Sequence, residues 1–506
     1  MNFEITAKDV MGRTGKLKTP HGVVETPALM PVINPNLKFI PVKEMKRMGA
    51  QIVITNSYII YRNENLKERA IEKGVHGLIE SDLPVMTDSG SYQLMVYGDV
   101  EIDNTSIVEF QNQIRSDIVV PLDIPTPPDT SKSEAEKDLK ETLEREREAT
   151  ELHAKIGGER LIAAPIQGAI YPDLRRFSAK KAAELKADFY PIGGVVPLLD
   201  SYRFPEVVRI ILEVKSELPP SAPVHLFGAG HPMVFAMAVA LGCDFFDSAA
   251  YALYAKDDRY LTVHGTKKLD ELQYFPCSCP VCNEFTPEKL RKVPKDERQL
   301  LLGKHNLHVS FEEINVIKQA IKEKTLFDLV ESRIRGHPYL VSAWRVIKEY
   351  RDLIELYDPS AKQGFFYTGI ESIYRPAVQR HHRKILNLSL DEKRYVISAK
   401  PVLESNQTVH ADFYLLPVFG VVVGEFYPGG HAELPEEEYI EEEALEEGFN
   451  CLLNFLRENA DKSFELRLTK RWVDFIKSKG LKPKLPENAE IVEIVEIEGS
   501  SRIIER

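Results

Sequence analysis

The stretch from residue 51 to residue 248 repeats one pattern, in which a short apolar run ends in polar or small residues and an amphipathic segment follows. Apolar runs of this length predict buried parallel strands, and the segments between them predict helices. Repeated strand–helix units over about 200 residues favour an α/β protein with a (β/α)8 TIM barrel. A doubly wound open sheet is the alternative. The runs occupy residues 51–57, 83–90, 117–123, 161–168, 188–194, 224–230 and 244–248.

Other segments extend this pattern at both ends. The first 30 residues carry turn signals and predict a hairpin, and an eighth strand is expected among residues 260–270. The clearest helix spans residues 133–156, because this segment is rich in Glu, Lys, Leu and Ala and is followed by Gly157. Helical periodicity resumes over residues 310–322 and 326–357.

Polar residues lie at the carboxyl ends of the predicted strands. In a barrel these ends converge on one mouth, which is where barrel enzymes carry out their chemistry. Taken alone, each aspartate is more often a cap or a turn residue. Together, two carboxylates can cleave a glycosidic bond, and a third can accept hydrogen bonds from a purine. The sequence therefore predicts a barrel enzyme that acts at a glycosidic carbon. The residues are Asp88, Asp123, Gln167, Gly194 and Asp247.

Three cysteines within six residues, Cys277, Cys279 and Cys282, are followed by His305. Three thiols and one imidazole suit a tetrahedral zinc ion, and a closed shell of four protein ligands is typical of a structural site. We expect His305 at the start of a helix, with His308 as the competing fourth ligand. Cys243 and Cys451 lie in apolar surroundings and are expected in the core.

The length of 506 residues exceeds what one core accommodates, so several domains are expected. We predict a barrel domain over residues 1–355 that includes a zinc-binding subdomain at about 270–310. After Asp358-Pro359 the texture of the sequence changes. Two small α+β domains are predicted there, over residues 360–432 and 433–506.

The N-terminus has no basic start followed by an apolar run, so we expect no signal peptide. Residues 233–246 are too short to span a bilayer, and clustered thiols fit a reducing cytoplasm. A net charge of −12 argues weakly against a partner bound mainly through phosphates. A local basic face can coexist with that total, and Arg175-Arg176 and residues 380–384 are candidates for it. Each could equally be a solvated helix surface.

Several segments resemble the tRNA-guanine transglycosylases, and the resemblance covers about residues 1–350 in order. The matching segments are residues 12–22, 26–27, 30–32, 87–93, 166–168, 192–194 and 246–248, and the cysteine cluster followed by His305-Asn306. Further segments of this sequence are similar to the archaeal members of the family. The segments that carry this likeness are residues 122–128, 247–260, 366–367, 371–372 and 375–376.

The resemblance implies a TIM barrel with one structural zinc ion per subunit and a homodimer formed through the zinc subdomain. It implies exchange of a guanine at position 15 of the tRNA D-loop for preQ0 (7-cyano-7-deazaguanine) in archaeosine biosynthesis, by a covalent, ping-pong mechanism. Asp247 corresponds to the nucleophile and Asp88 to the acid/base. The substrate-binding residues implied by the resemblance are Asp123, Gln167, Gly194, Val195, Ser89 and Tyr92.

Archaeal members commonly end in an RNA-binding PUA domain, and we expect none here. Either a separate protein supplies that domain, or tRNA is held without it. Three other functions stay open at this point. The first is an archaeosine synthase-like or noncatalytic paralogue, and the presence of Asp88, Asp123 and Asp247 argues against it. The second is a retaining glycosidase on the same barrel. The third is a zinc scaffold without activity, which the paired carboxylates also argue against.

Overall fold

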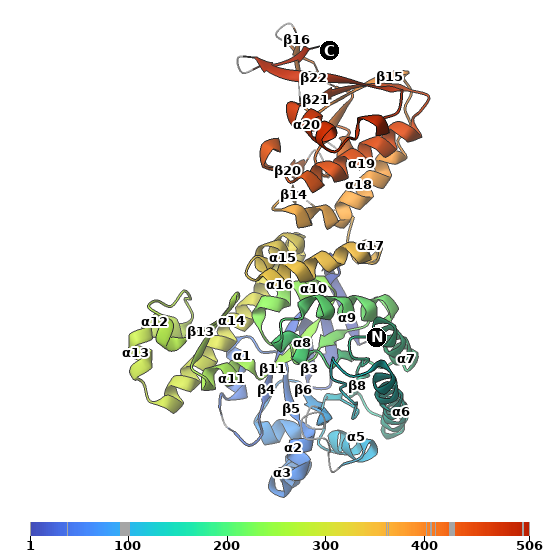
Figure 1. Ribbon diagram of the computed structural model, residues 1–506. Helices are drawn as coiled ribbons and strands as arrows, with labels where there is room; N and C mark the ends of the chain where they lie inside the picture. Colours follow the sequence, from blue (N-terminus) through green and yellow to red (C-terminus); the bar gives the residue numbers. More distant parts are fainter. Residues whose placement is uncertain are drawn as a thin grey trace. The chain divides into compact units, whose positions relative to one another are not determined.

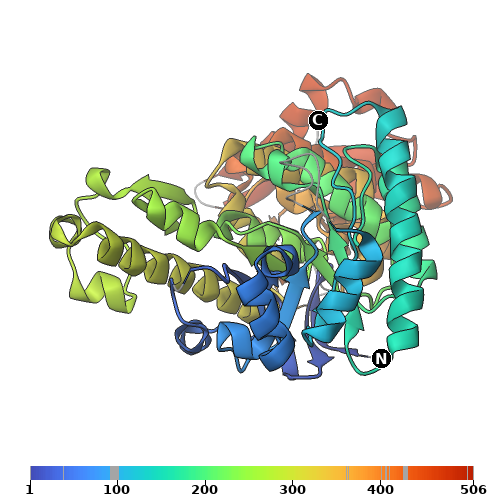
Figure 2. The same ribbon diagram turned by 90° about the horizontal axis from the view of Figure 1, so that it is seen from below.

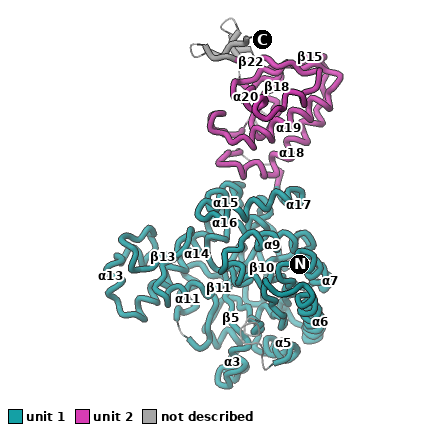
Figure 3. Tube along the Cα trace, viewed as in Figure 1, with its two compact units in different colours: residues 1–358 teal, residues 359–506 magenta. Residues whose placement is uncertain are grey.

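The structure is a computed structural model that describes residues 2–37, 39–91, 102–360, 362, 364–400, 402–404, 407–409, 411–424, 431–497 and 500–504. It divides into two compact units, unit 1 over residues 1–358 and unit 2 over residues 359–506 (Figure 3). Within the described residues, no helix is long and apolar enough to cross a bilayer.

Among the described residues of unit 1, eight parallel strands form one sheet (Figure 1). The two ends of this sheet meet through two bridges. Just after β8, Ala163 pairs with Phe189, which precedes β9, and Ile166 pairs with Ile192, the last residue of β9. The sheet is therefore a closed barrel, and the predicted TIM barrel is confirmed. Its strands, in the order in which they neighbour one another, are β4 (Ala28–Ile33), β5 (Val53–Asn56), β6 (Val85–Asp88), β7 (Ile118–Val119), β8 (Leu161–Ile162), β9 (Tyr190–Ile192), β10 (Val224–Leu226) and β11 (Phe245–Ser248).

The seven predicted strands all belong to the barrel, but the expected position of the eighth was wrong. Residues 259–268 form an antiparallel hairpin, β12 (Arg259–Thr262) and β13 (Gly265–Lys268), outside the barrel. The eighth barrel strand is β4, which pairs with β5 on one side and β11 on the other. The sequence did not predict β4, because Pro27 precedes it and Pro31 lies within it, and proline argues against a central strand.

The amino-terminal end of the barrel is covered by a sheet and not by a simple hairpin. β1 (Phe3–Asp9), β2 (Gly12–Thr19) and β3 (Gly22–Thr26) pair antiparallel. Phe3, Leu17 and Val24 from this sheet share one buried cluster with barrel residues such as Met30 and Ile54. This end is therefore packed with apolar side chains, which leaves the opposite end for a cavity.

Helices surround the barrel, as the pattern of the sequence predicts. The predicted helix at 133–156 is α6 (Lys132–Ile156), whose N-cap Ser131 accepts from the Glu134 N–H. α6 ends at Gly157, where φ is 71°. Figure 2 shows α6 on one flank of the barrel and the long helix α14 (Lys295–Glu323) reaching outward on the other. Further helices are α1 (Val42–Met48), α2 (Ser57–Arg62), α3 (Glu64–Ile79), α5 (Asn104–Gln113), α7 (Pro172–Glu184), α8 (Val196–Asp200), α9 (Phe204–Glu217), α10 (Phe235–Ala240) and α11 (Ala250–Lys256).

A subdomain projects from the barrel after α11. It consists of the β12–β13 hairpin, α12 (Pro280–Glu284), α13 (Pro287–Lys292) and the first part of α14. Tyr260, Leu272, Leu290 and Leu302 form its small core. The rest of α14 packs on β1, β2 and α10, and α15 (Leu326–Ile334), α16 (Pro338–Trp344) and α17 (Arg351–Tyr357) follow.

Unit 2 is built on one mixed sheet. Its order is β19 (Gly420–Val422), β18 (Phe413–Leu416), β15 (Arg394–Ser398), β21 (Ser463–Leu468), β22 (Ala489–Ile497) and β23 (Ser500–Ile504). Strands from both sides of residue 432, where the sequence suggested a division, thus lie in this sheet. Helices α19 (Glu442–Glu458) and α20 (Lys470–Ser478) contribute Phe449, Leu452 and Trp472 to its core.

Candidate active site and metal centre

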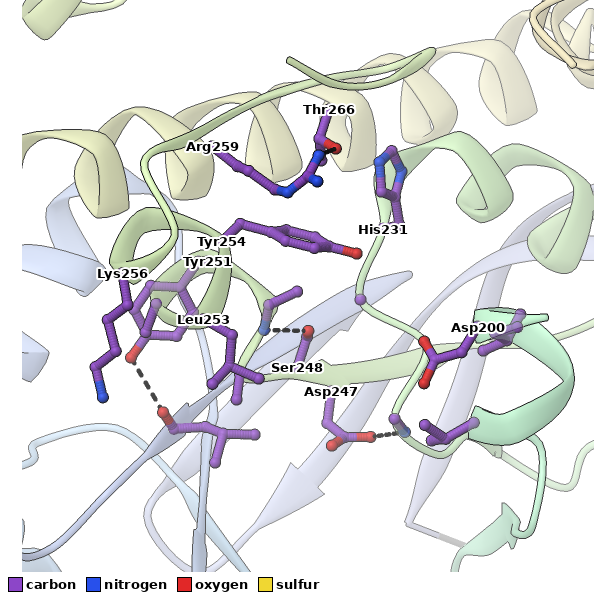
Figure 4. A pocket seen from close by; sticks show the side chains of 18 of the residues that line it. Asp200, His231, Asp247, Ser248, Tyr251, Leu253, Tyr254, Lys256, Arg259 and Thr266 are labelled. Atoms are coloured by element: carbon purple, nitrogen blue, oxygen red, sulfur yellow. Dashed lines mark hydrogen bonds between the residues drawn. The ribbon is translucent and has the colours of Figure 1, made fainter. Parts of the chain in front are cut away.

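A cavity of about 1120 Å³ opens at the carboxyl ends of the barrel strands. Asp88, the last residue of β6, and Asp247, in β11, both line it. These strands are separated by β5 and β4, and the two carboxylates nevertheless line one space at the carboxyl ends of the strands. Figure 4 shows Asp247 within this cavity, with one of its hydrogen bonds dashed.

Asp247 is held through one of its two carboxylate oxygens. Oδ1 accepts from the backbone N–H of Gly228 at 2.5 Å and lies 2.8 Å from His225 Nε2. Within the described part of the chain, no donor contacts Oδ2. Asp247 lines the cavity, and these bonds fix Oδ1 while Oδ2 keeps no donor among the described residues.

His225 is a partner of Asp247 that sequence reasoning missed. It lies in β10, is fully buried, and its Nδ1 has no hydrogen-bond partner among the described residues. The bond at Nε2 therefore makes Nε2–H the donor to Asp247. The available signal was the alternation of the strand, since Val224 and Leu226 share one face and His225 between them takes the other.

Asp88 has an environment that favours the protonated carboxyl group. Burial is the largest cause, and the negative charges of Asp123 and Asp247 add to it. Hydrogen bonds from the Gly90 N–H and from Asn56 oppose the shift, and the pKa rises to about 7. A carboxyl group with this pKa can both give and accept a proton at neutral pH.

Asp123 and Gln167 lie beside the cavity and contact each other. Gln167 Nε2 donates to Asp123 Oδ2 at 2.5 Å, while the Gln167 Oε1 atom is buried without a partner among the described residues. Burial raises the pKa of Asp123 despite hydrogen bonds from Ser91 and Gln167. Ser89 contacts the Ser91 hydroxyl and donates to the Pro121 carbonyl. The predicted substrate-binding residues that the structure describes do not line this cavity. They are Asp123, Gln167, Ser89, Gly194 and Val195.

Gly193 and Gly194 bring the backbone close to Gln167. A Cβ atom on Gly193 would lie 2.1 Å from Gln167 Nε2, so no other residue fits there without a shift. Gly194 has a φ of 71°, which also favours glycine. Tyr92, the remaining predicted binding residue, lies outside the described residues.

Both interpretations of Arg175 from the sequence, a basic face and a solvated helix surface, were wrong. Arg175 is fully buried and donates to the carbonyl groups of Ile166, Ala169 and Gly193. Its guanidinium therefore ties together the two loops that carry Gln167 and Gly194. The neighbouring Arg176 pairs with Glu213, and His381 of the second candidate face is buried. The charge of an arginine does not indicate exposure when backbone carbonyls accept from its guanidinium, as they do here from Nε and Nη1 of Arg175.

The four predicted metal ligands lie together in the subdomain. One ligand atom from each of Cys277, Cys279, Cys282 and His305 lies within 4.8 Å of the others. His305 Nε2 lies 2.9 Å from the Leu261 carbonyl and donates to it, so Nδ1 faces the thiols at 3.4 Å. Metal-binding histidines are commonly oriented in this way, by a hydrogen bond from the ring nitrogen that does not bind the metal. His305 completes the cluster and His308 does not.

The predicted position of His305 at the start of a helix was wrong, because α14 begins at Lys295. Tyr260 stacks on the His305 ring at 3.7 Å, and its hydroxyl lies 3.3 Å from Cys282 Sγ. None of these ligands is among the described residues that line the cavity. The cluster can therefore hold a metal ion away from the two carboxylates.

Comparison with known proteins settles the family. Residues 9–339 match the sequence profile of queuine tRNA-ribosyltransferase. The chain belongs to this family of tRNA-guanine transglycosylases. It is 57% identical to the tRNA-guanine(15) transglycosylase of Archaeoglobus fulgidus, over 97% of this chain and 98% of that relative. The enzymes of the same name from Methanosarcina acetivorans and Pyrococcus abyssi are 49% and 47% identical, over 91% and 92% of this chain and 93% and 77% of theirs.

Membership of the transglycosylase family confirms the resemblance predicted from the sequence, including its archaeal form. It also makes the chain an enzyme of the transferase class. The matched region ends at residue 339, so it contains the barrel and the subdomain with the cysteine cluster. The relatives, by contrast, extend the similarity into unit 2.

Proposed function

We propose that this protein exchanges the guanine at position 15 of tRNA for preQ0, through a covalent bond between Asp247 and the ribose. The observation that carries this proposal is the meeting of Asp88 and Asp247 at one cavity, although their strands are not neighbours. The names of the relatives support tRNA as the substrate and guanine 15 as the target. The target nucleotide must leave the base stack to reach a barrel mouth.

The first half of the exchange uses Asp247 as nucleophile. Oδ2 attacks ribose C1′, the bond from C1′ to guanine N9 breaks, and the departing guanine takes a proton from Asp88. In the second half, preQ0 gives its N9 proton to Asp88 and attacks C1′, which releases the Asp247 carboxylate. One base replaces another, so neither water nor ATP is consumed. The raised pKa of Asp88 suits both of its tasks.

His225 and the Gly228 N–H support the second half most strongly. Both donate to Oδ1 of Asp247, which becomes the carbonyl oxygen of the ribosyl ester. When the ester bond breaks, negative charge returns to this carboxylate, and two positioned donors stabilise it. We assign His225 a positioning role, because it acts through Asp247.

The buried groups beside the cavity form the proposed pocket that recognises the base. The carboxylate of Asp123 can accept from the ring N–H and the amino group that guanine and preQ0 share. Gln167, Gly194 and Val195 complete this pocket, with Ser89 and Tyr92 as further substrate-binding residues. Arg175 holds the loops of Gln167 and Gly194 together through their backbone carbonyls.

We assign zinc to the cluster of three cysteines and one histidine, with Cys277, Cys279, Cys282 and His305 as the four ligands. The ion would cross-link the knuckle of α12 to α14 and contribute folding energy to the subdomain. We expect about one zinc ion per chain by elemental analysis, and a lower melting temperature for Cys279→Ser. Cys451→Ser, which alters a buried cysteine of unit 2, serves as the control and keeps its metal. Metal-free protein with an unchanged melting temperature would contradict the assignment.

The proposed partners follow from the reaction. They are tRNA, guanine and preQ0. We also propose a second copy of the chain at the zinc subdomain. A tRNA substrate and a reduced thiol cluster fit the cytoplasm.

The deciding experiment compares Asp247→Asn with the wild type for incorporation of labelled guanine into tRNA. We expect the variant to lose about 10^4-fold or more in rate, because it lacks the nucleophile. The wild type should also give a covalent RNA–protein band on a denaturing gel, and the variant should not. Asp270→Asn, which alters an exposed aspartate outside the cavity lining, is the matched control.

Three outcomes would overturn the proposal. Undiminished exchange by Asp247→Asn would remove this residue from the mechanism. Release of guanine without replacement would show a glycosidase. An inactive wild type that still binds tRNA would show a noncatalytic paralogue.

A further inference from the structure

The cavity extends beyond the two carboxylates into a compartment that the exchange chemistry does not use. We call it the aromatic wing. Figure 4 shows His231 and Tyr254 near one another in this part of the cavity. The residues that define the wing are Tyr202, Phe204, His231, Tyr254, His264 and His337.

Tyr202 has a backbone conformation that is unfavourable for a tyrosine. It follows α8, and its φ is 58°, in the left-handed region. The N–H of Arg203 donates to the Leu198 carbonyl, and the N–H of Tyr202 donates to the Leu199 carbonyl. These bonds close the end of a helix at a position where glycine or asparagine is usual. Asparagine would therefore suit this backbone better than tyrosine does.

The ring of Tyr202 forms a flat stack at the cavity wall. It lies 4.9 Å from the His337 ring, with only 7° between the planes. His337 is itself fixed, since its Nδ1 accepts from the Tyr339 N–H at the start of α16. Despite this contact and an edge contact with Phe204, Tyr202 remains 48% exposed. If the stack only packed α16 against α9, burial of the exposed part of the Tyr202 ring would stabilise the fold further.

We propose that the Tyr202–His337 stack is a platform for a nucleobase next to the exchanged guanosine. This inference rests on the proposed tRNA substrate. When one nucleotide leaves the stack of a tRNA loop, its neighbours lose a stacking partner. Single-stranded bases recover that interaction on aromatic side chains, and every base has a suitable face. The platform and Asp247 line the same cavity, so one strand of RNA can reach both.

The test compares Tyr202→Asn and Tyr202→Phe with the wild type. Asparagine suits the left-handed backbone and removes the ring, so the melting temperature should not fall. The KM for tRNA and the Kd for tRNA should both rise about 10-fold or more in Tyr202→Asn. Tyr202→Phe keeps the ring face and should behave like the wild type. The KM for free guanine should not change in either variant, because the platform does not hold the exchanged base.

A fluorescent base locates the contact. In tRNA with 2-aminopurine beside guanosine 15, binding to the wild type and Tyr202→Phe should quench the fluorescence, and binding to Tyr202→Asn should not. Phe177→Ala is the matched control, because Phe177 is also 48% exposed but lies on α7 outside the cavity lining.

Wild-type KM, Kd and quenching in Tyr202→Asn would overturn the platform. A rise in KM for free guanine would overturn it too, because the ring would then hold the exchanged base. The binding and fluorescence arms need no turnover. A wild type that binds tRNA without exchange would therefore refute the proposed function and still decide the platform.

Discussion

The two ends of the barrel hold aspartates in opposite environments. At the carboxyl ends of the strands, Asp88 and Asp247 line a cavity. At the amino ends, Asp117 precedes β7 and Asp244 precedes β11, and both are fully buried. The two pairs share a residue type and a barrel, and differ in what surrounds the carboxylate.

The amino-end carboxylates are saturated with donors. Asp244 accepts two bonds of 2.8 Å from Arg13 and one from the Val224 N–H. Asp117 accepts from the backbone N–H groups of His21 and Val85, and both of its oxygens lie against histidine rings. Their ionised form is satisfied, so they serve the fold.

The carboxyl-end pair is supplied with fewer donors. Asp88 has negative neighbours and a raised pKa, and Asp247 keeps one oxygen free of donors from the described residues. The comparison indicates that the number of donors around a buried carboxylate separates structural from reactive groups in this barrel. Three substitutions test it, in order of decreasing effect.

Replacing Asp88 should harm activity and help stability. Asp88→Asn should lower the rate of guanine exchange by about 10^2–10^4-fold, because the proton donor and acceptor is lost. The pKa of Asp88 is about 7 in the folded protein, above its ordinary value near 4. The wild type therefore loses stability as the pH rises from about 4 to about 7, and the variant does not.

Denaturation of Asp88→Asn and the wild type at pH 5 and pH 8 checks this sign. The variant should be the more stable protein at pH 8, by a margin that shrinks toward pH 5. An equal difference in stability at pH 5 and pH 8 would mean that Asp88 is ionised in the folded state at both pH values.

Replacing Asp244 should lower the stability of the protein, whereas replacing Asp88 should raise it. Asp244→Asn removes the charge that compensates the buried Arg13, and loss of one partner of a buried pair destabilises by about 3–5 kcal/mol. Chemical denaturation measures the loss. Asp82→Asn, which breaks an exposed pair with Lys46, should change stability little. Equal stability of the two variants would remove the distinction between the barrel ends.

Replacing Asp117 should give the smallest effect, with a distinct pH dependence. Burial alone would raise its pKa, but hydrogen bonds from His76, Val85 and His21 outweigh burial and lower it. The stabilisation is therefore present above the ordinary value near 4 and is lost as the pH falls through the folded pKa. Asp117→Asn should lose about 1–3 kcal/mol at pH 7.

Thermal melts between pH 3 and pH 7 check this prediction. The difference between Asp117→Asn and the wild type should shrink at the acidic end, and a constant difference would contradict it. The variant, where folded, should retain guanine exchange, because Asp117 lies away from the cavity lining.

The sequence by itself determined the parts of this protein whose signal is local. Apolar runs marked seven barrel strands, and the polar residues that follow them include Asp88 and Asp247. The spacing of Cys277, Cys279 and Cys282 predicted a metal cluster, and Gly157 marked the end of α6. These signals are readable because strand and helix periods and short ligand spacings involve residues close together in the chain.

The tertiary structure decided everything that depends on partners far apart in the chain. Only the assembled barrel made β4 the eighth strand, set the pairing of β10 with β11 that places His225 against Asp247, and buried Arg175 among backbone carbonyls. The contact between Tyr202 and His337 likewise exists only because α16 packs on α9. Periodicity states which face of an element is buried but not which residue it meets, because that choice is made when the whole barrel packs.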